Sequence, residues 1–336
     1  MKLLSVTVPC YNSQDYMNRC VDSLLKGGER VEIIIVDDGS KDNTGAIADE
    51  YARKYPTIVK VVHQENGGHG EGINSGLKVA SGKFFKTVDS DDAVNDDFPH
   101  FLDLLEGPAS QADLVLTNYI YTYFDGRKNN SINYKNIFKP ETLLTWDQTN
   151  KFHVKQCLTI HSCTFNTELM KRSGMVLPKH IFYEDNLMVC TILPLTEKIF
   201  YYNADLYQYT IGREGQSVQE DVMTKRYKHQ LYVAEKIFET CHLDDMKAKS
   251  RRLYQLMYHE FYMMYAIGCI YARRSPEPDA EENLQKMWDA AYAFDEKYAK
   301  KLRKRSTLKF LNIKGKFGKG FANFIYKLAH SIVKFN

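Results

Sequence analysis

The sequence predicts an α/β fold: a mostly parallel sheet flanked by helices, followed by a helical C-terminal extension. Three observations support this fold class. Strand-like and helix-like segments alternate through the first hundred residues, as in a doubly wound sheet with right-handed crossovers. Residues 31–38 are a nearly continuous β-branched run, typical of a strand buried on both faces of a parallel sheet. Residues 218–304 show a helical pattern rich in Tyr and Met.

The alternation begins at the N-terminus. Residues 3–9 form the first predicted strand, and Ser13 is the expected N-cap of a helix with Tyr16, Cys20 and Leu24 on one face. Ligands of such sheets bind beyond the carboxyl ends of the strands, where three of these segments end in polar clusters. The other predicted strands cover 57–64, 83–89 and 112–125, and the other predicted helices cover 42–54 and 70–80.

The regular alternation stops near residue 126. Residues 254–274 are apolar nearly all round, which predicts a buried helix, and residues 273–282 are the expected loop after it. We therefore expect three regions: an α/β domain over 1–215, a helical accessory region over 216–305 and a basic amphipathic tail over 306–336.

The composition is typical of a soluble globular protein, but its basic and acidic residues are unevenly distributed along the chain. The chain has 336 residues, 44% of them hydrophobic and 26% charged, which allows a sizeable core. Residues 297–336 hold twelve Lys and Arg but no Asp or Glu, which leaves 33 of the 45 basic residues against all 42 acidic ones. A mildly acidic body with a basic tail is the result.

Cysteine usage and hydropathy bear on the compartment. The seven scattered cysteines show no CxxC spacing, which argues against a zinc site or a disulfide framework and indicates a reducing compartment. Pro9 interrupts the short apolar run at the N-terminus, and no run of 18 apolar residues exists. We therefore expect a cytoplasmic protein without an export signal or a membrane-spanning helix.

Two polar segments follow the second and third strands. Asp37 and Asp38 end the second strand; one of them either caps the next helix or accepts hydrogen bonds from a base or ribose. Glycines crowd residues 66–76, which allows either a tight turn or a backbone that approaches a phosphate at a helix N-terminus. Neither a dinucleotide fingerprint nor a Walker motif is present.

Five aspartates lie within nine positions at the end of the strand predicted over 83–89. Two carboxylates about 4 Å apart repel by ~4 kcal/mol at an effective dielectric near 20. The start of the next helix explains Asp96 and Asp97, whereas Asp92 fits either a cap or a ligand. For Asp89 and Asp91, a divalent cation that prefers oxygen ligands and bridges substrate phosphates offsets the repulsion better.

A further acidic pair opens a helical pattern near residue 184. Glu184 and Asp185 there are either first-turn acids favoured by the helix dipole or a general base for a hydroxyl nucleophile. Sequence position alone leaves both interpretations open.

Taken in order, these segments resemble the family 2 glycosyltransferases of the GT-A fold, of the type that builds bacterial polysaccharides and cell-surface glycans. The resemblance covers roughly residues 1–215 and implies a nucleotide-diphosphate sugar donor, most simply a UDP-sugar, and one-step inverting transfer. The matching segments are VPCYN (8–12), VDDGSKDNT (36–44), NGGHGEGINSG (66–76), DSDD (89–92) and YEDN (183–186).

The resemblance also implies roles for single residues. Asp91 and Asp89 would bind Mn²⁺ or Mg²⁺, and Asp185 would deprotonate the acceptor hydroxyl with Glu184 beside it. Ile73 stands where the family has Arg, so a cationic contact to the diphosphate is missing. His69 or Lys78 either replaces that contact or has only a surface role. Substrate contacts are expected from Pro9, Tyr11, Asn12, Asp38, Gly67, Gly68, Asn74, Asp89 and Arg213, and Arg213 with Ser217 would close over the phosphates.

The basic tail has apolar residues at helical spacing. One interpretation is a terminal helix docked on the body; the other, which we favour, is an in-plane helix on the anionic inner face of the cell membrane. The acidic body disfavours nucleic acid as a partner. The apolar positions are Phe317, Phe321, Phe324, Leu328 and Ile332, interspersed with Lys316, Lys319 and Lys327.

The expected function is transfer of a sugar to a hydroxyl of a glycan or lipid-linked acceptor. Two alternatives remain. One is transfer to a soluble or protein acceptor, with the tail used for oligomerisation. The other is a nucleotide-sugar-binding protein without catalysis, against which the near-complete set of motifs argues.

Overall fold

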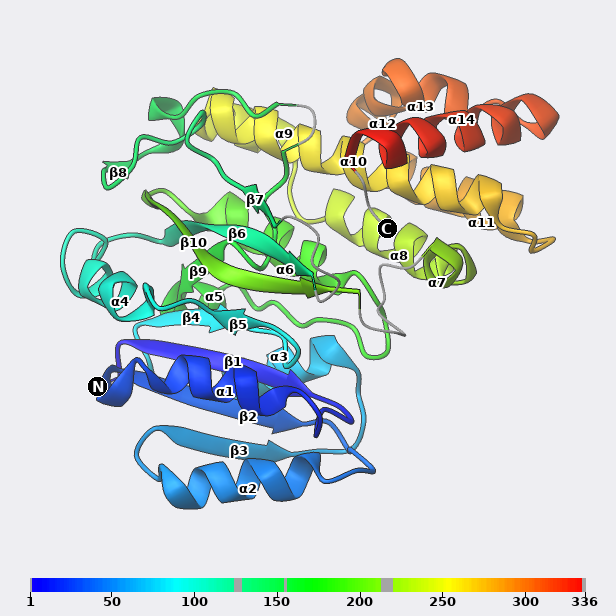
Figure 1. Ribbon diagram of the computed structural model, residues 1–336. Coiled ribbons are helices and arrows are strands. Elements are labelled where there is room, and N and C mark those ends of the chain that lie inside the picture. The colour runs from blue at the N-terminus through cyan, green and yellow to red at the C-terminus, as the bar shows by residue number, and fades with distance from the viewer. Residues whose placement is uncertain (1, 124–128, 154–155, 213–219, 334–336) are drawn as a thin grey trace. The chain divides into compact units, whose positions relative to one another are not determined.

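The computed structural model describes residues 2–123, 129–153, 156–212 and 220–333 (Figure 1). The chain divides into two compact units, Met1–Ile211 and Gly212–Asn336.

Strands and helices alternate through the first half of unit 1. They are β1 (Leu4–Cys10), α1 (Met17–Leu25), β2 (Val31–Asp37), α2 (Thr44–Lys54), β3 (Val59–His63), α3 (His69–Val79) and β4 (Phe84–Thr87). The strands form a parallel sheet in the order β3-β2-β1-β4. Every residue of β1 and β2 is buried, which explains their mostly apolar sequence. Helices connect the strands, so that the carboxyl ends of the strands lie along one edge of the sheet.

The second half of the sheet is mixed. Strand β9 (Cys163–Asn166) runs antiparallel between β4 and β6 (Leu114–Tyr123), and β10 (Ile199–Ile211) runs parallel to β6 with shifts in register. Shorter strands and helices complete the unit. They are β5 (Ala93–Val94), α4 (Phe98–Glu106), β7 (Asn130–Ile132), β8 (Leu143–Leu144), α5 (Thr167–Arg172) and α6 (Glu184–Ile192).

The predicted α/β class with a helical C-terminal region is confirmed, but one local prediction is wrong. Helix α1 begins at Met17 with Tyr16 as its N-cap, so Ser13 does not cap it. The Ser13 hydroxyl lies 2.9 Å from the Ser90 hydroxyl instead, and its carbonyl accepts hydrogen bonds from the Tyr16 and Met17 amides. Ser13 therefore joins the ends of β1 and β4.

The aspartates before α4 differ from one another. Asp97 is the N-cap residue of α4, but its side chain caps nothing and accepts a 2.6 Å hydrogen bond from the Tyr202 hydroxyl. Asp96 is exposed and forms an ion pair with Lys26. Asp96 and Asp97 thus stand at the start of α4, as predicted. Their side chains do not cap the helix but bind Lys26 and Tyr202.

Unit 2 is helical. Its helices are α7 (Glu220–Lys225), α8 (Tyr227–Phe238), α9 (Leu243–Lys249), α10 (Arg251–Arg274), α11 (Ala280–Phe294), α12 (Glu296–Arg303), α13 (Ser306–Leu311) and α14 (Gly315–Val333). The unit is built around α10, which is packed against α8, α9, α11, α13 and α14 (Figure 1). Ser250 caps α10 through hydrogen bonds from the Arg252 and Leu253 amides, and the predicted loop follows its end. Across the described residues, no helix combines the length and the hydropathy needed to cross a membrane.

Candidate active site

A histidine links two acidic segments that lie far apart in the sequence. His69 is the first residue of α3, Asp89 follows the end of β4, and Glu184 is the first residue of α6. Nδ1 of His69 lies 2.7 Å from Oε1 of Glu184, and Nε2 lies 3.0 Å from Oδ1 of Asp89. One imidazole therefore bridges the two carboxylates at the carboxyl edge of the sheet.

The electrostatics of this bridge favour charged partners. Burial opposes the charge on His69, but the carboxylates of Asp89 and Glu184 outweigh it and hold the pKa of the imidazole well above its usual range. Burial likewise opposes ionisation of Asp89, yet the facing His69 and His161 rings hold the pKa of Asp89 well below its usual range. Each partner therefore favours the charged form of the other.

Asp185, the next residue after Glu184, has a raised pKa, and its role as a general base stays a prediction. Burial, and then the negative charge of Glu184, raise the pKa of Asp185 to about 6, so this carboxylate is a stronger base than an exposed one. Tyr183 precedes the pair with φ +72°, a left-handed conformation that costs a non-glycine residue about 1–3 kcal/mol. The turn that presents Asp185 is therefore strained and must be held by its contacts.

Three side chains form a group that can hold a metal ion. Asp89, Asp92 and His161 each offer one ligand atom, and the three atoms lie within 4.8 Å of one another. An ion ~2.1–2.3 Å from each atom requires separations of up to about 4.5 Å, so the group fits a divalent cation after a small shift. The buried Nδ1 of His161 has no hydrogen-bond partner among the described residues. Carboxylate ligands suit Mg²⁺ and Mn²⁺ and an imidazole suits Zn²⁺ and iron, so the donor set admits several divalent cations.

The sequence left Asp92 open between a helix cap and a ligand, and in the structure its side chain is a buried hydrogen-bond acceptor. Its carboxylate is fully buried and accepts hydrogen bonds from the Tyr207 hydroxyl at 2.6 Å and the Thr210 amide at 2.8 Å. Burial, then the charges of Asp89 and Asp91, raise the pKa of Asp92 well above its usual range. Asp91 is partly exposed and is not a member of the three-residue group, so its part in metal binding stays a prediction.

Lys86 is a buried cation that sequence reasoning missed. Its Nζ donates to the carbonyl oxygens of His161 at 2.8 Å and Cys163 at 3.2 Å. Burial lowers the pKa of Lys86 to about 8. The signal was present, because a lysine in the middle of an otherwise apolar strand requires a partner. Lys86 thus anchors the segment that carries His161.

The glycine-rich loop is held by Asp38 at the end of β2. Oδ1 of Asp38 accepts hydrogen bonds from the Gly67 amide at 2.8 Å and the Gln64 side chain at 2.7 Å, and Oδ2 accepts one from the Gly68 amide at 2.8 Å. Gly68 has φ +85°, which favours glycine. The predicted contact of Asp38 with nucleobase or ribose stays a prediction, whereas its contacts within the protein position the loop.

The remaining predicted substrate residues surround this edge of the sheet. Pro9 lies at the end of β1, and Tyr11 after it is 50% exposed. Asn12 accepts a hydrogen bond from the Lys41 amide, and Asn74 exchanges hydrogen bonds with the backbone of Leu177.

Other predicted residues of the site lie elsewhere or cannot be placed. Ile73 is fully buried, so its position belongs to the core rather than to a phosphate site. Lys78, in the last turn of α3, has an exposed side chain. Arg213 and Ser217 lie outside the described residues.

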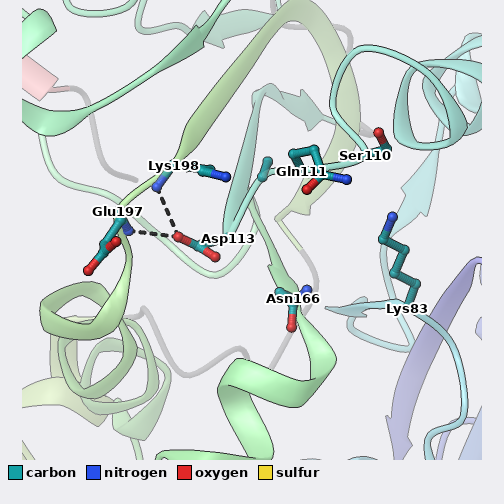
Figure 2. A pocket seen from close by; sticks show the side chains of 8 residues that line it. Lys83, Ser110, Gln111, Asp113, Asn166, Glu197 and Lys198 are labelled. Atoms are coloured by element: carbon teal, nitrogen blue, oxygen red, sulfur yellow. Dashed lines mark hydrogen bonds between the residues drawn. The ribbon is translucent and has the colours of Figure 1, made fainter.

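A separate cavity of about 340 Å³ lies at the opposite edge of the sheet (Figure 2). Lys83, Asp113 and Lys198, which line it, directly precede or flank the starts of β4, β6 and β10. Figure 2 shows Asp113 held by the backbone amides of Glu197 and Lys198, at 2.8 and 2.9 Å. This cavity is therefore distinct from the site built around Asp89.

Comparisons with known proteins show what the chain is similar to. Residues 5–167 match the model of the family described as glycosyl transferase family 2. Glycosyltransferase GlyG of Streptococcus pneumoniae is 41% identical over 130 residues, which are 38% of this chain and 42% of GlyG. The chain thus spans less than half the length of this curated relative.

Two solved structures have the same fold. Residues 1–349 of S. aureus TarS, in complex with UDP-GlcNAc, match with a TM-score of 0.69 and 22% identity over 98% of this chain and 92% of that one. The mannosyltransferase PcManGT from Pyrobaculum calidifontis, in complex with GDP-Man and Mn²⁺, matches with a TM-score of 0.51 and 13% identity over 99% and 88% of the two chains.

Proposed function

We propose that this chain is a glycosyltransferase with inverting chemistry, because residues 5–167 match the model of glycosyl transferase family 2. The donor is a nucleotide-diphosphate sugar, and the UDP-GlcNAc bound to TarS supports a UDP-sugar. The acceptor is a hydroxyl of a glycan or lipid-linked molecule. The observation that carries the proposal is the bridge from Asp89 through His69 to Glu184, which brings the expected donor and base segments together.

Asp89, with Asp91, Asp92 and His161 around it, would hold a Mn²⁺ or Mg²⁺ ion. A divalent cation, when bound, neutralises the diphosphate leaving group. The Asp-Asp-His group of the structure and the Mn²⁺ bound to PcManGT support this cofactor. Asp38, Gly67 and Gly68 form the loop that the nucleotide would approach, with Pro9, Tyr11, Asn12 and Asn74 beside it.

Asp185 would act as the general base. Its carboxylate takes the proton of the acceptor hydroxyl while the acceptor oxygen forms a bond to the anomeric carbon. The bond from that carbon to the diphosphate oxygen breaks in the same step, and the nucleoside diphosphate leaves with the electron pair. Glu184 keeps its contact with His69 and raises the basicity of its neighbour.

The proposal is tested by measuring release of nucleoside diphosphate from a panel of nucleotide sugars with Mn²⁺, in the presence of short glycan and lipid-linked acceptors. We expect turnover with a UDP-sugar, and the opposite anomeric configuration in the product. Tight UDP binding without turnover of any donor would show a binding protein instead. Retained configuration would overturn the one-step mechanism.

The tail region supports a peripheral membrane location. In α14, Phe317, Phe324 and Leu328 are 59%, 60% and 45% exposed and share one face of the helix. Lys316, Lys319 and Lys327 are exposed on the adjoining face, whereas Gly318 and Ala322 are buried in unit 2. An apolar stripe beside a basic one matches an anionic membrane surface. The side chain of Ile332 lies outside the described part of the chain.

A further inference from the structure

His69 is the first residue of α3 and is less buried than Ile73. Ile73, one helical turn later on the same side of the helix, is fully buried, so the fold already has an apolar anchor there. His69, by contrast, lies only partly buried at the N-terminus of the helix, between Asp89 and Glu184. The ring of His69 therefore contributes polar contacts at the site rather than apolar packing in the core.

The start of α3 lies close to the start of α6, which allows His69 to reach Glu184. A Cβ atom added to Gly70 would lie 2.9 Å from Cγ of Glu184 and 3.0 Å from Cβ of Leu177. The start of α3 and the start of α6 therefore meet without room for a side chain at position 70. This approach brings Nδ1 of His69 within 2.7 Å of Glu184.

Both ring nitrogens of His69 lie within hydrogen-bond distance of carboxylate oxygens, one from each acidic segment. Glu184 is 2% exposed, so its buried carboxylate depends on partners within the protein. The two nitrogens lie on different sides of the ring, so a single side chain contacts both segments at once.

We propose that His69 is a positioning residue: its ring ties the donor-side carboxylate Asp89 to the turn that carries Asp185. This inference rests on the proposed function. The two ring nitrogens of His69 are thus directed at protein carboxylates. It fixes the separation of the donor site from the base, and it holds a turn whose Tyr183 has a strained backbone.

The test compares His69→Phe, which keeps a ring but no hydrogen bond, with His69→Arg, which restores a cation with several donors. His100→Phe is the matched control, because His100 is an exposed histidine near a carboxylate in α4. Loss of two charge-assisted hydrogen bonds predicts that His69→Phe lowers kcat and weakens UDP–Mn²⁺ binding, each by at least about tenfold. His69→Arg should recover part of both losses, and the control should change neither.

Two kinetic results would overturn the inference: a folded His69→Phe protein within threefold of wild type in kcat and UDP affinity, or an Arg variant as impaired as the Phe variant. A ligand-free readout separates this inference from the proposed function. Amide hydrogen exchange of residues 183–186 should quicken in His69→Phe relative to wild type and to His100→Phe. If no donor is turned over, the proposed function fails while this exchange still decides the role of His69, and unchanged exchange refutes the bridge.

If His69→Phe does not fold, His69→Gln replaces it. A glutamine carries both of its N–H donors on one nitrogen and cannot reproduce the two separated ring nitrogens, so an intermediate loss is expected. In a Glu184→Gln background the effect of changing His69 should shrink, because half of the bridge is already gone. Full additivity of the two substitutions would refute the coupling.

Discussion

Oδ2 of Asp38 accepts a hydrogen bond from the amide of Gly68 at 2.8 Å, across the loop that opens α3. The other oxygen of the same carboxylate accepts from Gly67 and Gln64. An acid at the tip of β2 thus shapes the glycine segment that precedes His69. The acid and the glycines of two separate motifs form one structural unit.

Replacing Asp38 by Asn should loosen this unit. An amide offers one acceptor oxygen, so its NH₂ group would face at least one N–H donor of the loop. We expect a loss of about 1–3 kcal/mol in the free energy of unfolding, measured by urea denaturation. Asp49→Asn is the control, because Asp49 is an exposed acid on α2. Equal stability of the two variants would contradict the role given to Asp38.

Asp91→Ala should abolish Mn²⁺-dependent UDP binding and leave the fold intact. The measurement is calorimetric titration of UDP with and without Mn²⁺. Asp96→Ala is the matched control, since Asp96 belongs to the same acidic segment but pairs with Lys26 at the surface. Unchanged Mn²⁺-dependent affinity in Asp91→Ala would remove that residue from the metal site and leave Asp89, Asp92 and His161 as its ligands.

Asp185→Asn should retain donor binding but slow transfer by ~10²–10⁴-fold, the usual contribution of a general base. An amide keeps the size of the side chain and cannot accept the proton of the acceptor. Steady-state kinetics with saturating donor measure the loss, and UDP affinity serves as the internal control. Normal turnover would exclude Asp185 from the mechanism.

The pH dependence follows from the raised pKa of Asp185. The base must be deprotonated, so kcat should be constant above about pH 6 and fall roughly tenfold per pH unit below it. Glu184 raises this pKa, while His69 and His161 lower it. Glu184→Gln should therefore move the acid limb of the pH–rate profile to lower pH. A shift to higher pH would contradict the assigned electrostatics.

Phe317→Ser combined with Phe324→Ser should weaken binding to anionic lipid vesicles by at least about tenfold, because two large apolar side chains leave the interface. Co-sedimentation with phosphatidylglycerol vesicles measures this, and vesicles of phosphatidylcholine alone should bind weakly. Val176→Ser is the control, as Val176 is an exposed apolar residue of unit 1. Equal vesicle binding by all variants would contradict a membrane contact through the exposed phenylalanines of α14.

The first half of the sheet could be predicted because its strands carry a local signal. Residues 31–37 are apolar almost without a break because both faces are covered, and the same logic locates β1 and β4. Strand β10 escaped prediction because its register shifts near Asp205 interrupt any simple alternation. Its pairing partners β6 and β5 also lie far from it in the sequence.

Only those residues of the site that stand in recognisable sequence motifs could be predicted. Asp89 and Asp185 stand in motifs that carry their own signal. The burial of Asp92 depends on Tyr207 and Thr210, more than a hundred residues away, and His69 meets Glu184 across 115 positions. Such distant contacts leave no trace in local periodicity, so the metal group with His161 and the bridge through His69 emerge only from the tertiary structure.

The interleaved order of the sheet limits how the chain can be cut. The family match ends at residue 167, but β10 comes later in the chain and covers the long edge of β6. A fragment ending at residue 167 would expose that edge and an apolar strand face to other molecules, and an open edge of this kind promotes aggregation. Expression of a soluble catalytic fragment should therefore require the chain through Ile211, where the first compact unit ends.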